Sequence, residues 1–382
     1  MENQPPVTGM TIRPATMREI EAMGLDYLQD RPGFQPSMLR VGVYKDRVIS
    51  RVLLERLTLR YGSVYLRAAG LGSMETTYRY RGRGYSAALI RDVLATMREQ
   101  GAHLALLNDT SGGYFSRFGF SPVWPDYQMS FEAATASHLE SSLVLRDPIP
   151  RDIPQMAALY EQQWGGRVTV ERSPVLWLWR IACACYQVLV AADDTGQVYG
   201  YIAGDDLLSA QVEVVAGSMD AAAALMAFAG QRHVTAEGHD SRVIVWPVPP
   251  DDSLITYARA LMDVAAAARF NHSMGWMARV IDMGGLADAL LPELYAQMTA
   301  VLPDERPASL VFDYDADGVI FGLHGRPASR VRLAYPDFIQ VMFGSLAPEA
   351  LGMRENLAED AVLLLRALFP PRVTALGWWD WF

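Results

Sequence analysis

Arginine and glycine alternate in a short segment, residues 79–84 (RYRGRG), between a strand-like run and a strongly helical run that begins at Tyr85. Two glycines let the backbone approach an anion closely, and three arginines supply positive charge. The first turn of the following helix offers unpaired N–H groups and the positive end of the helix dipole. The segment therefore predicts a site for a phosphate or pyrophosphate group.

A dinucleotide-binding fingerprint is an alternative interpretation of the same glycines. Gly82 and Gly84 followed by Ala87, a helix, a strand and then Asp109 fit the pattern with its acidic ribose ligand. That pattern needs a parallel βαβ unit with the first glycine directly after a strand. The preceding segments instead indicate antiparallel strands, and residues 75–81 intervene, which favours the simple phosphate site. An ordinary surface turn is the remaining alternative.

The hydrophobic pattern predicts the elements that position this loop. A short strand near Thr11 precedes a helix over 17–28, with Thr16 as N-cap and Glu19 closing a capping box. Residues 38–44, 48–60 and 64–74 predict an antiparallel meander. A helix over 85–100, a buried strand over 103–107 and a last strand near 128–131 complete the first unit.

The rest of the chain predicts two further units. After a small, polar linker, a second unit repeats the order of the first, with a helix after Asp152, strands over 187–192, 198–204 and 210–216, and an alanine-rich helix from Asp220. It lacks an arginine–glycine loop and is interpreted as a degenerate copy. The third unit has strands over 309–314, 318–323 and 330–333 and helices over 335–344 and 357–367. The domain boundaries expected are 1–136, 143–285 and 286–382.

Composition limits the possible partners. Acidic residues outnumber basic residues, 43 to 33, and the formal net charge of −10 argues against a nucleic-acid surface while fitting a cationic substrate or plain solubility. No secretory signal or membrane-spanning run is visible. Histidines do not pair with Cys or Glu at ligand spacing, so no metal is expected. Cys183 and Cys185 alone predict a reduced, cytoplasmic protein rather than a disulfide framework.

At this point the motifs resemble a known family. Arg79-x-x-Gly82-x-Gly84 fits the R/Q-x-x-G-x-G/A signature of GNAT-superfamily N-acetyltransferases, and the spacing from Asn108 to Phe118-Gly119-Phe120 resembles that family's next conserved segment. The whole chain resembles the Eis (enhanced intracellular survival) group. This resemblance implies an α/β (α+β) fold of tandem GNAT domains, the second degenerate, followed by a sterol-carrier-like (SCP2-like) domain.

The resemblance also implies site residues, with acetyl-CoA as co-substrate. The cofactor-binding residues it implies are Gly72, Ser73 and Met74 for the pantetheine arm and thioester, Arg79, Arg81, Gly82, Arg83, Gly84 and Tyr85 for the pyrophosphate, and Asn108 beyond the splayed strand. The carboxylate of the C-terminal Phe382 is the expected base, because an α-carboxylate is ionised at neutral pH. Asp26, Tyr27, Phe115 and Trp381 are expected at the substrate pocket.

One position departs from the family pattern. The general-acid tyrosine is expected four residues before Gly119, where this chain has Phe115, and a phenyl ring has no proton to donate. Tyr114 is adjacent and is the candidate replacement or a packing aromatic; transfer without an assigned acid is a third option. Glu75 is a further candidate base or a solvated carboxylate.

The sequence thus predicts an acetyl-CoA-dependent N-acetyltransferase acting on an amine of a small, cationic, aminoglycoside-like acceptor. Direct transfer in a ternary complex is expected because no cysteine nucleophile is placed near the loop. The alternative is a catalytically lapsed protein of the same fold that binds acyl-CoA or lipid. Members of the Eis group form hexamers, so the resemblance implies a homo-oligomer, a hexamer. Neither nucleic acid nor a membrane is expected as a partner.

Overall fold

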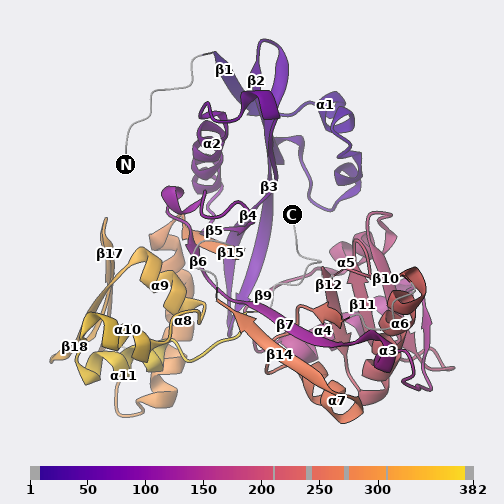
Figure 1. The fold of residues 1–382 in the computed structure, drawn as a ribbon. Helices are drawn as coiled ribbons and strands as arrows, with labels where there is room; N and C mark the ends of the chain where they lie inside the picture. Colours follow the sequence, from indigo (N-terminus) through magenta and orange to yellow (C-terminus); the bar gives the residue numbers. More distant parts are fainter. Residues whose placement is uncertain (1–8, 210, 238–242, 271–274, 307–308, 375–382) are drawn as a thin grey trace.

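The chain forms three lobes that together contain four β-sheets (Figure 1). The structure is a computed structural model and describes residues 9–209, 211–237, 243–270, 275–306 and 309–374. Helices pack on sheets in every lobe, which confirms the predicted mixed α/β fold class. None of the helices in these ranges is both long enough and apolar enough to cross a membrane.

The first lobe is built on a sheet with the strand order β1-β2-β3-β4-β5-β15-β6, and β9 pairs with the far end of β3. Strands β2, β3 and β4 form the antiparallel meander that the sequence predicts, and β5 runs parallel to β4. The bounds are β1 Met10–Pro14, β2 Leu39–Tyr44, β3 Arg47–Tyr61, β4 Val64–Thr76, β5 Leu104–Asp109, β6 Ser121–Pro122, β9 Thr169–Val170 and β15 Gly275–Val280.

Helices cover both faces of this sheet. Helix α2, Tyr85–Glu99, buries Leu89, Ile90 and Val93 against β3, β4 and β5, as its 3.6-residue period predicts. On the opposite face lie α1, Met17–Ala22, and the short 3-10 helix η1, Asp26–Asp30. The remaining 3-10 helices of this lobe are η2 Pro36–Met38, η3 Tyr78–Tyr80 and η4 Ser116–Phe118.

The first helix is shorter than predicted. The capping box between Thr16 and Glu19 is present, so the predicted start at Met17 is confirmed. The predicted end at Leu28 is wrong, because Gly24 takes a left-handed conformation with φ of +68° and stops the helix. The chain then re-forms a single 3-10 segment, η1, which contains Asp26 and Tyr27.

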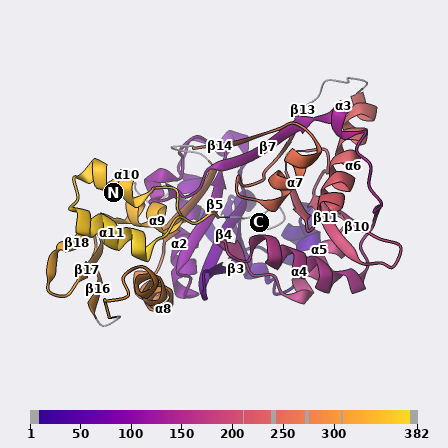
Figure 2. The ribbon, with the colours of Figure 1, turned by 90° about the horizontal axis from the view of Figure 1, so that it is seen from below.

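The first and second lobes exchange two strands, and Figure 2 shows one of them, β7, Asp126–Glu132, extending beside β14, Val264–Arg269, toward the second lobe. Strand β7, predicted as the last strand of the first unit, pairs instead with β13, Val243–Trp246, and β14. In the opposite direction, β15 follows the second lobe in sequence but inserts between β5 and β6 of the first sheet. A sheet of each lobe therefore includes a strand that adjoins the other lobe in sequence.

The second lobe contains the sheet β12-β11-β10-β8 as well as the three-stranded sheet around β7. Its core includes a buried ion pair in which Arg172 donates from Nη1 to Glu213 Oε1 at 2.7 Å. The predicted strands and the alanine-rich helix are present. The bounds are α3 Ala133–Ala136, β8 Val144–Arg146, η5 Pro150–Asp152, α4 Ile153–Trp164, α5 Pro174–Ala182, β10 Gln187–Ala192, β11 Val198–Gly204, β12 Val212–Ala216, α6 Met219–Glu237 and α7 Ser253–Leu261.

The third lobe packs four helices around a small antiparallel sheet, β16-β17-β18. Its core is continuous with that of the first lobe, because Leu59 and Leu66 share a cluster with Phe321 and Phe338. The bounds are α8 Met283–Val301, β16 Leu310–Tyr314, β17 Gly318–Leu323, β18 Arg326–Ala334, α9 Tyr335–Met342, α10 Pro348–Glu355 and α11 Glu359–Leu368.

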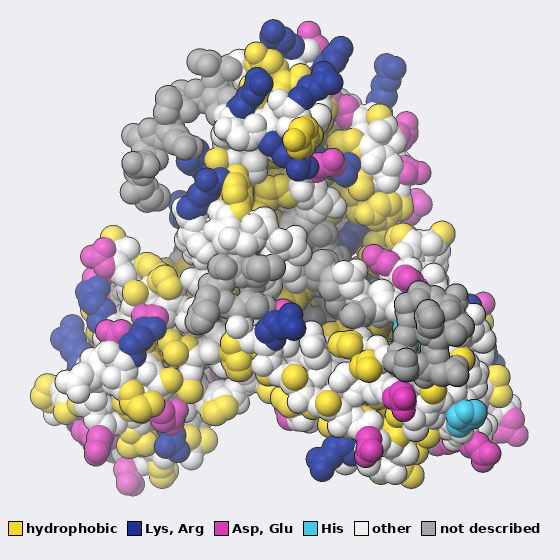
Figure 3. Space-filling view, in the orientation of Figure 1, with side chains coloured by type: hydrophobic (Ala, Val, Ile, Leu, Met, Phe, Trp, Pro, Cys, Tyr) yellow, Lys and Arg dark blue, Asp and Glu magenta, His cyan; other side chains and the backbone are white. Residues whose placement is uncertain are grey.

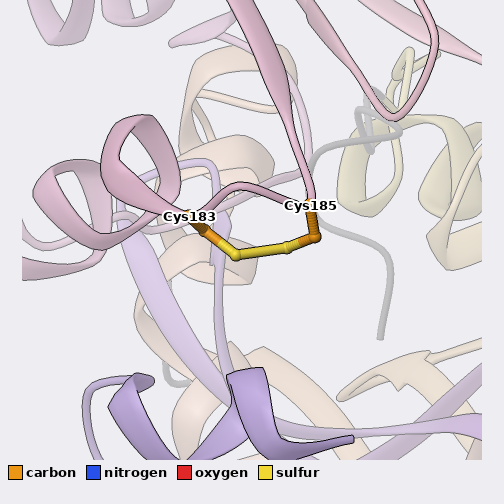
Figure 4. The surroundings of a disulfide bond; sticks show 2 residues. All are labelled: Cys183 and Cys185. Atoms are coloured by element: carbon orange, nitrogen blue, oxygen red, sulfur yellow. A yellow bond between two sulfur atoms is a disulfide. The ribbon is translucent and has the colours of Figure 1, made fainter. Parts of the chain in front are cut away.

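The two cysteines form a disulfide, which corrects the prediction of reduced thiols. Cys183 ends α5 and Cys185 precedes β10, so the bond closes a loop of only three residues, as Figure 4 shows. Their Cα atoms lie 5.3 Å apart, within the range that a disulfide requires. The number of cysteines did not indicate this bond, whereas their spacing of two residues already places them close together.

Candidate active site

A bulge bends β4 next to the arginine–glycine loop. Gly72 pairs with Leu53 and Glu75 pairs with Arg51, so two residues, Ser73 and Met74, face a single residue on β3. Ser73 takes a positive φ of 46°, which is uncommon outside glycine. The bulge turns the end of β4 away from a regular ladder and exposes its backbone along one edge.

Strands β4 and β5 separate beside this bulge. Their parallel pairing ends at Gly70 and Leu106, and both strands continue beyond it without pairing to each other. A cleft of about 770 Å³ opens between the diverging strands. Its lining includes the predicted residues Gly72, Ser73, Met74, Arg81, Gly82, Gly84, Tyr85, Asn108, Tyr114 and Phe115, together with Glu75, Asp109, Arg117 and Trp276.

The arginine–glycine loop closes one end of the cleft. Gly82 and Gly84 have φ values of +73° and +81°, so both positions require the conformational freedom of glycine. Gly84 is the N-cap of α2, whose first turn has neither a side-chain cap nor an acidic residue. The helix therefore presents uncapped N–H groups and its positive dipole end at a site that Gly84 and Tyr85 line.

Positive charge at this end is fixed in place. Arg81 donates from Nε to the carbonyl of Thr76 at 2.9 Å, which holds its guanidinium at the cleft. Arg79 and Arg83 belong to the same loop but do not line the cleft. Lys and Arg side chains also gather on the outer surface of this lobe (Figure 3). The sequence thus located the charged loop, while the structure distinguishes Arg81 from its two neighbours.

Asp109 supports the loop that forms the opposite wall. Its buried carboxylate accepts hydrogen bonds from the N–H of Ser111 at 2.6 Å and from the N–H of Gly113 at 3.1 Å, as well as from the Ser111 hydroxyl. These contacts commit Asp109 to the turn, so it is not placed as the ribose ligand of a dinucleotide. Asn108, the preceding residue, lines the cleft.

Two aromatic rings meet at the position of the expected general acid. Phe115 is 9% exposed and packs edge-on against Phe120, with ring centroids 6.1 Å apart. Tyr114 is half-buried, and the guanidinium of Arg117 lies over its ring at 3.9 Å from the centroid. Both rings line the cleft, so the structure brings together the residue that lacks a hydroxyl and its neighbour that has one.

Trp276 is a wall residue that no sequence pattern indicated. It lies on the inserted strand β15, pairs in register with Asn108, and stacks on Trp124 with centroids 5.2 Å apart. Its ring lines the cleft although it is about 170 positions from Asn108 in sequence. Only the strand insertion reveals that the second half of the chain contributes to this site.

The expected substrate residues lie at varying distances from the cleft. Glu75 lines it and forms an ion pair with Arg51 at 2.9 Å. Tyr27, on η1, is partly buried against the neighbouring hydrophobic cluster. Burial raises the pKa of its phenol, and the positive charge of Arg31 opposes that rise. Asp26 is exposed on η1, and neither Asp26 nor Tyr27 lines the cleft. Trp381 and Phe382 lie outside the described residues.

The described residues contain no group of three or more His, Cys, Asp or Glu side chains arranged to hold a metal ion. The lining of the cleft includes three glycines, which can offer only their backbone groups, together with several hydroxyls and two arginines, Arg81 and Arg117. Such a set suits an anionic, flexible ligand better than a cation.

Comparison with known protein families finds a match to the segment that contains most of the residues lining this cleft. Residues 21–123 match the acetyltransferase (GNAT) domain family. The GNAT domain so defined includes the β4 bulge, the arginine–glycine loop, Phe115 and Tyr114, but ends before the second and third lobes. No curated protein matches the chain.

Solved structures resemble the chain over its whole length. The GCN5-related N-acetyltransferases from Kribbella flavida and Anabaena variabilis are 16% and 15% identical, each with a TM-score of 0.60; the matches cover 99% and 98% of this chain and all of theirs. Eis1 from Mycobacterium abscessus is 16% identical with a TM-score of 0.54, covering 97% of this chain and 99% of its own. At these identities the likeness shows a shared fold.

Proposed function

We propose that the GNAT domain binds acetyl-CoA in the cleft between β4 and β5. The observation that carries this proposal is the uncapped start of α2, which lies beside Arg81 in the cleft that opens between the separated strands. A pyrophosphate fits the charged end, and an extended pantetheine arm fits the space between the separated strands.

The residues that would hold this co-substrate follow from the same geometry. The free edge of β4 at Gly72, Ser73 and Met74 would pair with the amide groups of the pantetheine arm, as a β-strand would. Asn108 would contact the arm from the opposite wall. When bound, the thioester supplies the acetyl group; the protein supplies orientation and exclusion of water.

We further propose that the acceptor is a primary amine of a small, cationic molecule, of which aminoglycosides are one class. Glu75 supports this proposal, because its carboxylate lines the cleft. Tyr114 is the candidate general acid, since it has a hydroxyl and lines the cleft beside Phe115. The carboxylate of Phe382 is the proposed base, and Trp381 would lie beside it.

A lapsed acyl-CoA- or lipid-binding protein is the second candidate function. The observation that favours it is the buried Phe115, which occupies the general-acid position and is held in an aromatic cluster without a hydroxyl. Removal of a general acid lowers rates by about 10²- to 10⁴-fold. In this case acetyl-CoA would bind, but transfer to amines would be absent.

Calorimetric titration with acetyl-CoA tests the binding step. We expect Arg81→Gln to weaken binding about tenfold or more, because it removes a charge-assisted contact to phosphate. Arg47→Gln, at the start of β3 and outside the cleft, is the matched control and should leave the affinity unchanged. Equal affinities of the wild type and Arg81→Gln would rule out the proposed site.

Release of CoA in the presence of a panel of amines tests the transfer step. Turnover with cationic amines supports the enzyme, whereas tight binding of acetyl-CoA without turnover supports the lapsed protein. Deletion of Phe382 is expected to reduce turnover, and unchanged activity would exclude its carboxylate as the base. We also propose a homo-oligomer, a hexamer; light scattering would give its mass.

A further inference from the structure

A second cleft, of about 670 Å³, lies between the GNAT domain and the third lobe. Its walls come from the last turn of α2, the end of β15, and the starts of α8 and α9. Arg98 is 14 residues after Gly84 on α2, so it lies about 20 Å along the helix from the arginine–glycine loop. This second cleft is therefore separate from the charged end of the first.

Two arginines from different elements line the second cleft. Arg98 donates from Nε to the carbonyl of Ile281 at 3.2 Å, and Arg279 donates from Nη1 to the carbonyl of Phe118. Among the described residues, neither guanidinium forms an ion pair with a carboxylate. Each guanidinium therefore retains N–H donors for a further acceptor.

The environment of this pair makes an anion favourable. Burial lowers the pKa of Arg279, and the positive charge of Arg98 lowers it further. A half-buried cation beside a like charge costs free energy until an anion compensates it. A bound oxyanion placed between the two guanidinium groups would neutralise both, and their planar forks match its geometry.

The start of α8 adds donors on the same side of the cleft. Met283 and Gly284 begin this 19-residue helix and line the cleft, and the N-cap Asp282 makes no side-chain hydrogen bond to the first turn. The carboxylate of Asp315 is already occupied, because it accepts a hydrogen bond from Arg332 Nη1 at 2.8 Å. Asp282 is thus the one described carboxylate in the lining that is left to oppose an anion.

We propose that this second cleft binds the phosphate group of a small phosphate monoester between Arg98 and Arg279. Tyr314 and Tyr335 lie in the same lining and give a surface for the organic part of the ligand. Tyr335 is held in place by a hydrogen bond from its hydroxyl to the carbonyl of Asp315 at 2.7 Å.

Calorimetric titration of the full chain with phenyl phosphate tests this proposal. We expect Arg98→Gln and Arg279→Gln each to weaken binding about tenfold, because each removes a charge-assisted contact. Asp282→Asn should tighten binding, since it removes the opposing carboxylate. Phenol, which has the same ring without the phosphate, should not bind measurably.

Two control variants separate this cleft from other arginines. Arg91→Gln, seven residues before Arg98 on the same helix, and Arg81→Gln, at the first cleft, should leave the affinity for phenyl phosphate unchanged. Loss of binding in either control, weaker binding by Asp282→Asn, or no binding by the wild type at millimolar ligand would overturn the proposal. Because Arg98 is exposed, its variant should unfold at the wild-type temperature and remain informative even if Arg279→Gln is destabilised.

Discussion

Tyr114 and Phe115 are adjacent aromatic residues with different chemical capacity. If Tyr114 is the general acid, Tyr114→Phe is expected to lower kcat by about 10²-fold or more, whereas Phe115→Tyr should change it little. The ring packing of both residues is kept in these substitutions, so the effect reports on the hydroxyl. Steady-state kinetics with the best acceptor amine would measure it.

The reverse result would identify a lapsed enzyme. A gain of turnover in Phe115→Tyr, with no effect of Tyr114→Phe, would mean that position 115 is correctly placed for the general acid and lacks only the hydroxyl group. Phe118→Tyr is a useful control, because this ring belongs to the same cluster but does not line the cleft.

Asp109 is expected to act through the loop that it holds. Asp109→Ala leaves the N–H groups of Ser111 and Gly113 without their acceptor and should destabilise the protein by about 1–3 kcal/mol. Thermal unfolding would measure this loss, with the exposed Asp194→Ala as control. A similar shift in both variants would contradict a specific role for the Asp109 carboxylate.

For single residues, the sequence could predict a site where the residues that form it are neighbours in the chain. Residues 79–84 combine glycines and arginines directly before a helix start, so the prediction of an anion site there needs only neighbours in the chain. Asp109 fits a ribose ligand by spacing alone, but its hydrogen bonds assign it to a turn. Trp276 could not be predicted, because its place beside Asn108 depends on a pairing between strands far apart in sequence.

Among the elements, β15 links the site to the rest of the chain. Ala278 is fully buried and pairs with both Leu106 on β5 and Ser121 on β6. Ala278→Asp would bury an unpaired charge and is expected to destabilise the protein by more than about 3 kcal/mol. Binding of acetyl-CoA should weaken as well, because β15 supports the strand that contains Asn108.

Ala266→Asp is the matched control for this substitution. It places the same charge on β14, whose Ala266 is exposed, and should change stability by no more than about 0.5 kcal/mol. Urea unfolding of the two variants would compare them. Equal stabilities would mean that β15 is not an essential part of the first sheet.

The hydrophobic pattern predicts most strands of the first lobe but not their partners. A short, mostly apolar segment such as 275–280 (GWMARV) is compatible with any sheet, so it gives no sign of which one it joins. The choice is made by tertiary contacts, including the stacking of Trp276 on Trp124. The same reason explains why β7 leaves the first unit for the second.

On the scale of the whole molecule, Glu293 connects three distant segments. Glu293 lies on α8 and is 3% exposed. Its carboxylate accepts hydrogen bonds from the backbone N–H of Ser63 at 2.8 Å and from the Ser63 hydroxyl at 2.7 Å. It also forms an ion pair with Arg372, near the end of the described chain. Thr374, two residues after Arg372, bridges to Val168, which immediately precedes β9 of the first sheet. This carboxylate therefore links the third lobe to the first.

The pKa of Glu293 gives this connection a definite pH dependence. Burial acts to raise the pKa, but the donors from Ser63, Arg372 and Gln297 outweigh it and lower the pKa from 4.5 to about 2. Because the folded pKa is below the unfolded one, the stabilisation is fully present above about pH 4.5 and is lost as the pH falls towards 2. Glu293→Gln should cost about 3 kcal/mol at neutral pH.

Thermal unfolding of the wild type and Glu293→Gln across pH 7 to about 2 would test this dependence. The difference between their midpoints should be constant above the unfolded pKa and shrink below it, because protonation removes from the wild type the charge that the substitution has already removed. Glu161→Gln breaks a more exposed ion pair with Arg60 and should have a small effect at every pH. A difference that persists unchanged to the acid limit would mean that Glu293 stabilises the lobes through packing rather than through its charge.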